Sequence, residues 1–128
     1  MIVAGVGCRR GAPASDVEAA IRAALVRAHI SADALDAVAT IAAKSAEAGI
    51  KIAARTFGVA LIEVSESAIK AASDRTATRS ARVLALMGVP AVAEAAALAA
   101  AGPAACLIGP RLVMGAATCA LAASDLPP

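Results

Sequence analysis

The sequence has very few aromatic residues and no long apolar run. Aromatic side chains make up 1% of its 128 residues, and Phe57 is the only one. Proteins that bind single-stranded nucleic acid usually stack bases on aromatic rings, so this composition disfavours that class. The longest uncharged runs, Ala95–Pro110 and Leu112–Ser124, are shorter than the roughly 18–20 apolar residues that a membrane-spanning helix needs. We therefore expect neither a nucleic-acid partner nor a membrane partner.

Cysteine, histidine and net charge are also scarce. Cys8, Cys106 and Cys119 form no C-x-x-C pair, and their odd number argues against both a disulfide framework and a zinc site. The single histidine, His29, supports no Ser–His–Asp or Cys–His constellation. The formal net charge is only +2. No targeting signal is recognisable at the N-terminus, so we expect a cytoplasmic protein. We also expect it to hold no metal and no cofactor.

Apolar residues dominate the composition instead. Hydrophobic residues make up 60% of the chain and charged residues 17%, and much of the apolar content is alanine. Such a chain buries enough apolar surface to fold, which excludes intrinsic disorder. Its length corresponds to one domain, which we expect to span residues 1–128.

Hydrophobic patterning predicts alternating strands and helices in the first half and short strands in the last third. Ser15 and Glu18 have the spacing of a capping box at the start of the first helix. The alternation favours an α/β fold with a mixed, mainly parallel sheet. The expected strands are Ile2–Cys8, Leu35–Ile41, Val59–Val64, Ala105–Ile108, Leu112–Met114 and Thr118–Ala122, and the expected helices are Ser15–His29, Ala42–Thr56, 65–72, 80–87 and Ala91–Ala101.

Three segments follow the first three expected strands. In open α/β sheets ligands bind beyond the carboxyl ends of the strands, so these segments are the candidate sites. They are residues 7–11, residues 40–44 and residues 65–67. If the strands are parallel neighbours, all three lie along one edge of the sheet.

The segment Gly7-Cys8-Arg9-Arg10-Gly11 has the composition of an anion site. Glycines let the backbone approach a ligand, two guanidinium groups can each grip a carboxylate or phosphate, and a helix N-terminus follows. A tight turn with two solvated arginines explains the same residues. Thr40 and Lys44, which follow the second strand, are further ligand-binding candidates, although from spacing alone a solvated side chain is the better explanation of Lys44. Cys8 is either a thiol activated by the arginines or a small strand-end residue.

Glu94 is the only acidic or basic residue between Arg82 and Arg111. Its place in the first turn of an alanine-rich helix suits an exposed carboxylate that interacts with the helix dipole. It suits equally a partly buried carboxylate that does acid–base work or holds a ligand amide or hydroxyl. Glu94 is therefore the candidate catalytic residue.

Three segments resemble a known family. They are residues 3–11 (VAGVGCRRG), residues 39–49 (ATI-x-x-K-x-x-E-x-G) and residues 88–98 (GVPAVAEAAAL), in order and at the expected spacing. Together they resemble the CobE family, which is similar to the C-terminal domain of CbiG, and both belong to cobalamin biosynthesis. The resemblance implies a three-layer α/β/α sandwich and a role in building the corrin ring.

The resemblance also suggests what the candidate residues do. Arg9, Arg10 and Lys44 would bind carboxylates of a precorrin or corrinoid, and Gly5, Gly7 and Gly11 would let its flat ring approach the backbone. The first hypothesis is a carrier or accessory factor for such an intermediate, working with other enzymes of the pathway.

Two alternatives remain open from the sequence. One is a hydrolase or rearrangement enzyme that acts on a precorrin, opening a lactone as CbiG does, with Glu94 as the acid or base. The other is a small anion-binding module that dimerises through its alanine-rich helix. The chain is accordingly expected to be a monomer or a homodimer.

Overall fold

The structure is a computed structural model and describes residues 1–42, 46–73, 92–109 and 111–124. The expected helix at 80–87 and the first residue of the expected helix Ala91–Ala101 lie outside these ranges. The described elements are β1 (Ile2–Cys8), α1 (Ala14–Arg27), the 3-10 turn η1 (Ala32–Ala34), β2 (Ala37–Ile41), α2 (Ala48–Phe57), β3 (Ala60–Val64), α3 (Glu66–Ser73), α5 (Val92–Ala101), β4 (Cys106–Leu107), β5 (Leu112–Met114) and β6 (Ala117–Ala123).

The described strands form one mixed sheet in the order β3-β2-β1-β6-β4. β1, β2 and β3 are parallel neighbours, whereas β6 runs antiparallel to β1. β4 pairs with the end of β6 and β5 with its beginning, so both lie along the same side of β6. All strands but β6 therefore point the same way, and the predicted mixed, mainly parallel sheet is confirmed.

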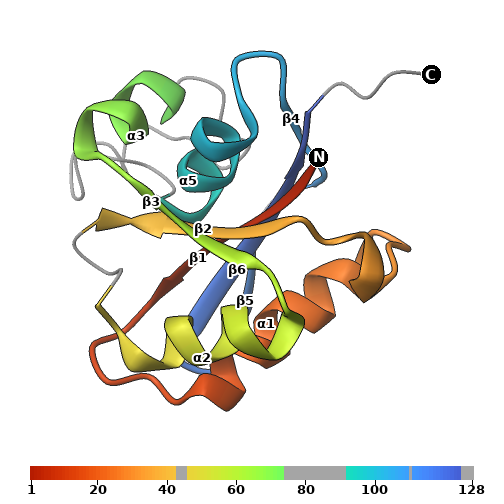
Figure 1. Ribbon diagram of the computed structural model, residues 1–128, viewed down its shortest axis with the longest axis vertical. Coiled ribbons are helices and arrows are strands. Elements are labelled where there is room, and N and C mark those ends of the chain that lie inside the picture. The colour runs from red at the N-terminus through yellow and green to blue at the C-terminus, as the bar shows by residue number, and fades with distance from the viewer. Residues whose placement is uncertain (43–45, 74–91, 110, 125–128) are drawn as a thin grey trace.

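Helices cover both faces of this sheet. α1 and α2 lie below it and α3 and α5 above it (Figure 1), which is the predicted three-layer sandwich. Successive side chains of a strand point to opposite faces, and β1 obeys this rule. Ala4 and Val6 enter the core under α1 and α2, whereas Val3 enters the core under α3 and α5.

The alanine-rich helix α5 packs unusually close to β1. Its turn from Ala93 to Ala97 lies directly over Gly5, where a Cβ atom would be only 2.6 Å from the Ala97 nitrogen. Small side chains on the helix and none on the strand permit this approach. Seven α5 residues are buried, so α5 is an internal element and not the exposed helix that the dimerisation alternative requires.

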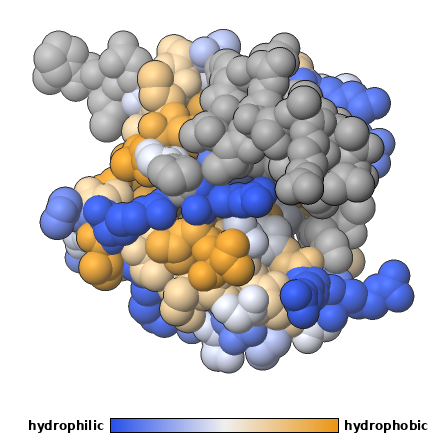
Figure 2. All heavy atoms as spheres, turned by 180° about the vertical axis from the view of Figure 1, so that it is seen from behind, coloured by the Kyte–Doolittle hydropathy of each residue, from blue (hydrophilic) through white to orange (hydrophobic). Residues whose placement is uncertain are grey.

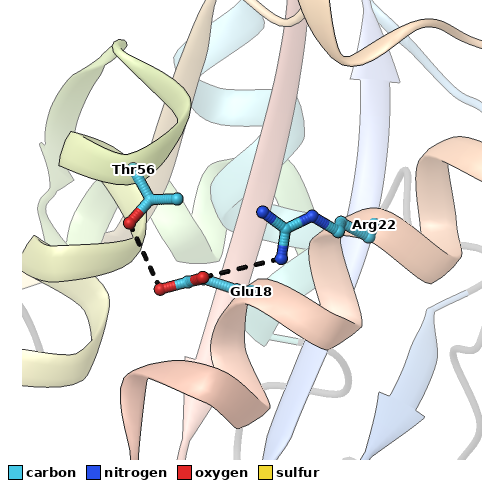
Figure 3. A network of polar contacts seen from close by, with 3 residues as sticks. All are labelled: Glu18, Arg22 and Thr56. Carbon is cyan, nitrogen blue, oxygen red and sulfur yellow. Dashed lines mark hydrogen bonds and ion pairs between the residues drawn. The ribbon is translucent and has the colours of Figure 1, made fainter.

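The beginning of α1 differs from the prediction. The helix starts at Ala14 with Pro13 as its N-cap residue and no side-chain cap, so the predicted capping box is wrong. Proline fixes its φ angle, here −69°, and the chain enters the helix at once, which leaves Ser15 inside the first turn. Glu18 instead accepts a hydrogen bond from Thr56 of α2 at 3.3 Å and pairs with Arg22 at 3.5 Å (Figure 3).

The other boundaries shift by a few residues. α2 begins at Ala48 instead of Ala42, with Glu47 as its N-cap residue, and β2 begins at Ala37 instead of Leu35. α2 ends at Phe57, one residue beyond the expected end at Thr56. Gly58 then adopts the left-handed conformation with φ 70°, and its N–H donates to a carbonyl of the last turn.

Candidate functional site

The parallel strands bring the three candidate segments to one edge, as predicted. β1 and β2 end on the same side of the molecule (Figure 1), and β3 is in parallel register with β2. α1 and α3 start at this edge because each follows a parallel strand. α5 starts at this edge too, because it ends at the opposite edge. There β4 follows shortly after α5, and Cys106 of β4 pairs with Ala123, which also pairs with Ile2 at the start of β1. Several positive helix N-termini therefore face this edge, which favours anions.

A tight turn presents two arginines between β1 and α1. The Ala12 N–H donates to the Arg9 carbonyl at 3.0 Å, and Gly11 holds φ 75° at the third position, where such a turn requires glycine. Arg9 and Arg10 are both exposed. In the part of the chain that the structure describes, no carboxylate forms an ion pair with either guanidinium group. The turn therefore holds two positive charges ready for an anion from outside.

Residues far along the chain fix this turn. The Gly11 N–H donates to Glu47 Oε1 at 2.9 Å, and the Arg9 N–H donates to the Ala116 carbonyl at 3.0 Å. Gly49 packs against the turn so closely that a Cβ atom there would be 2.5 Å from the Ala12 carbonyl oxygen. This support was not predicted from the sequence. Gly49 could have indicated it, because glycine is unfavourable inside a helix and often has a packing reason there.

The remaining residues of the first segment differ in accessibility. Gly7 and Cys8 are half-buried at the end of β1, and Cys8 packs against the core under α1. No described atom lies within 4 Å of the place where a Cβ of Gly7 would be. Gly5, which we expected beside a bound ring, is instead covered by α5.

The second segment does not offer a surface side chain at Thr40. This residue is fully buried, and its hydroxyl donates to the Val6 carbonyl at 2.9 Å. It thereby links the ends of β1 and β2 and supports the edge from within. Lys44 lies outside the described residues.

Glu94 is buried as well, which removes the expectation of an exposed carboxylate. Its exposed fraction is 0%, and its Oε2 atom accepts a hydrogen bond from the Arg111 N–H at 3.0 Å. A charge-assisted bond of this kind is stronger than one between neutral groups. This hydrogen bond therefore connects the first turn of α5 to the residue that precedes β5.

The third segment starts α3. Ser65 Oγ accepts from the Ala68 N–H at 3.2 Å and lies 3.1 Å from Ser67 Oγ. Ser65 thus acts as the N-cap of a short helix, which is the ordinary role of serine at this place.

The rear of the molecule has an area of hydrophobic surface bordered by hydrophilic side chains (Figure 2). Four large apolar side chains are exposed in the described parts of the chain: Val26, Ile52, Val113 and Met114. Val113 and Met114 belong to β5, which forms an outer strand of the sheet. Nowhere in the described ranges is a helix both long and apolar enough to cross a membrane.

Known proteins resemble this chain over nearly its whole length. The family model described as Cobalamin synthesis G C-terminus matches residues 2–122. Protein CobE from Sinorhizobium sp is 38% identical over 121 residues, which are 94% of this chain and 79% of the relative.

Two solved structures share both fold and sequence. One is the crystal structure of CobE, a protein from the cobalamin (vitamin B12) biosynthetic pathway, with a TM-score of 0.84 and 33% identity. The match covers 95% of this chain and 89% of the CobE chain. The other is the crystal structure of the cobalamin biosynthesis protein chiG from Agrobacterium tumefaciens str. C58, with a TM-score of 0.79 and 40% identity. The match covers 98% of this chain and 100% of the chiG chain.

Proposed function

We propose that this chain, which belongs to the cobalamin synthesis G C-terminus family and is a protein of cobalamin biosynthesis, binds a carboxylate-rich precorrin or corrinoid intermediate. In this proposal it is a carrier or accessory factor that holds the intermediate for other enzymes of the pathway. Cytoplasmic location and oligomeric state stay predictions from the sequence.

The two exposed arginines of the β1–α1 turn carry the proposal. Arg9 and Arg10 follow directly on β1, and no described carboxylate neutralises them. A guanidinium group can hold a carboxylate through two parallel hydrogen bonds, and corrin intermediates carry several carboxylates around one ring. Because Glu47 and Gly49 fix the turn, the backbone that carries the arginines needs little further ordering when the ligand binds.

The buried state of Glu94 favours binding over catalysis. Glu94 has no exposed surface, and its Oε2 atom accepts a hydrogen bond from the chain's own backbone. An acid or base must come within hydrogen-bond distance of its substrate. The hydrolase or rearrangement alternative needs Glu94 to do so, and we therefore give Glu94 a structural role.

The proposal is tested by mixing purified protein with hydrogenobyrinic acid, a stable corrin polycarboxylate, and recording visible spectra after gel filtration. The protein contains neither tryptophan nor tyrosine, so its own near-ultraviolet absorbance stays low. We expect co-elution with an unchanged ligand spectrum. A spectrum that changes with time would reveal turnover and overturn the carrier role.

Variants identify the contact. Loss of a hydrogen bond to a charged group costs about 1.5–3 kcal/mol, so Arg9→Ala and Arg10→Ala should each weaken binding by about tenfold or more. Arg55→Ala, which removes an exposed arginine in the last turn of α2, is the matched control and should bind like the wild type. If the double Arg9→Ala, Arg10→Ala variant binds hydrogenobyrinic acid as tightly as the wild type, the arginines are not the contact.

A further inference from the structure

The upper face of the sheet is covered by α5 at Gly5, but no described residue covers it at Gly7, the next β1 position on that face. Gly7 lies two residues beyond Gly5 and therefore on the same face, about 7 Å farther along the strand. At Gly5 a Cβ would collide with α5, whereas at Gly7 it would meet no described atom within 4 Å. Among the described elements, the cover of this face ends between these two glycines.

Gly7 is the centre of a row that crosses four strands. Thr118 of β6 pairs with Gly7, and Val113 of β5 pairs with Thr118. On the other side, Ile41 lies two residues beyond Ala39, which pairs with Gly5. Paired residues point to the same face, so these four side-chain positions form one line. Strand spacing makes this row about 14 Å long.

The row is mostly apolar and has no side chain at its centre. Gly7 occupies the centre, Ile41 and Thr118 are half-buried, and Val113 is 61% exposed. A planar ring can therefore lie on the row and contact backbone at its centre and aliphatic side chains at its ends. Ring burial of this kind is driven by the removal of apolar surface from water.

Positive charge borders the row. Arg9 and Arg10 directly follow the strand that contains Gly7, and the exposed Arg111 directly precedes the strand that contains Val113. The Glu94 carboxylate fixes the Arg111 backbone on the α5 side of the sheet. A ring that lies on the row and carries carboxylates on its rim would thus find guanidinium groups near both sides.

From this geometry we propose that the row Ile41–Gly7–Thr118–Val113 is the seat of a flat polycarboxylate macrocycle, whose carboxylates bind Arg9, Arg10 and Arg111. The inference rests on the proposed function and deepens it, because it states which surface the ring covers. It assigns Gly7 as the residue that decides whether the ring can approach.

Gly7→Val tests the seat. The backbone of Gly7 is not in the left-handed region and a Cβ there meets no described atom within 4 Å, so the variant should fold normally while its side chain occupies the seat. We expect hydrogenobyrinic acid to bind at least tenfold more weakly. Ala60→Val creates the same side chain by adding two methyl-sized carbons at an exposed position of β3, outside the row, and should leave binding unchanged. Circular dichroism and urea unfolding of both variants verify the fold.

A second substitution keeps the test decisive if Gly7→Val fails to fold. Val113→Ser shortens and polarises an exposed side chain at the end of the row, and we expect roughly a fivefold to tenfold loss of affinity from the lost apolar contact. If the wild type binds no hydrogenobyrinic acid, the proposed function itself fails. If the wild type binds it and both Gly7→Val and Val113→Ser bind equally well, the ring lies elsewhere and only this inference is overturned.

Discussion

Replacement of Gly5 by alanine should be far more damaging than the same replacement at Gly7. At Gly5 the new Cβ would lie 2.6 Å from the Ala97 nitrogen and closer still to the Ala93 carbonyl oxygen. Ordinary contact begins near 3.4 Å. The backbone of α5 must therefore retreat by about 0.8 Å, the difference between these two distances, and by more at Ala93.

A retreat of this size weakens the packing of the whole helix. A gap of roughly 0.5–1 Å loses a quarter to a half of the dispersion energy between facing atoms. α5 buries Leu98 and six smaller residues against its neighbours, so we expect a loss of about 3 kcal/mol, the upper part of the usual range for overpacked cores. A domain with a stability of roughly 5–15 kcal/mol survives this loss.

Urea unfolding measures this loss of stability. Far-ultraviolet circular dichroism can follow the unfolding, because it does not depend on aromatic fluorescence. With a slope of about 2 kcal/mol per molar urea, Gly5→Ala should lower the midpoint by about 1.5 M. Gly7→Ala, on the same strand and face, should stay within about 0.3 M of the wild type. Equal midpoints for the two variants would refute the close packing of α5 on β1 and, with it, the open seat at Gly7.

Further predictions concern the carboxylates and the thiols. Glu47→Ala frees the β1–α1 turn and should weaken hydrogenobyrinic acid binding by about tenfold, whereas Glu47→Gln keeps an acceptor oxygen and should bind nearly as the wild type does; equal binding by both would contradict the role of this bond. Glu94→Ala removes the acceptor of the Arg111 N–H and should lower the free energy of unfolding, measured in urea, by about 3 kcal/mol, with a smaller loss for Glu94→Gln. Burial raises the pKa of Cys119 from 9.0 to about 12, so the folded chain retains a proton that the unfolded chain releases, and the free energy of unfolding should fall as the pH rises from about 9 toward 12. At pH 8 a thiol reagent should modify the exposed Cys106 before Cys119, and mass spectrometry would detect the opposite order.

Local patterns were sufficient to predict the order of elements. Apolar runs bounded by turn residues predicted the strands Ile2–Cys8 and Val59–Val64 to within a residue of their described bounds. The end of α2 was predicted to within one residue, and Gly58, which follows it, adopts the left-handed conformation that glycine favours at helix ends. Strand–helix alternation then implied parallel neighbours, since a crossover returns the chain to the same side of the sheet.

The sequence by itself thus determined the α/β fold, the common edge of the candidate segments and the arginine pair that leaves β1. Only the tertiary structure decided which candidates stay accessible. Gly5 and Gly7 look alike along the chain, but the described part of α5 covers Gly5 and not Gly7. Glu94 and Glu47 find their backbone partners 17 and 36 residues away. Such contacts depend on how helices pack over the sheet, and residue spacing along one strand or helix carries no information about them.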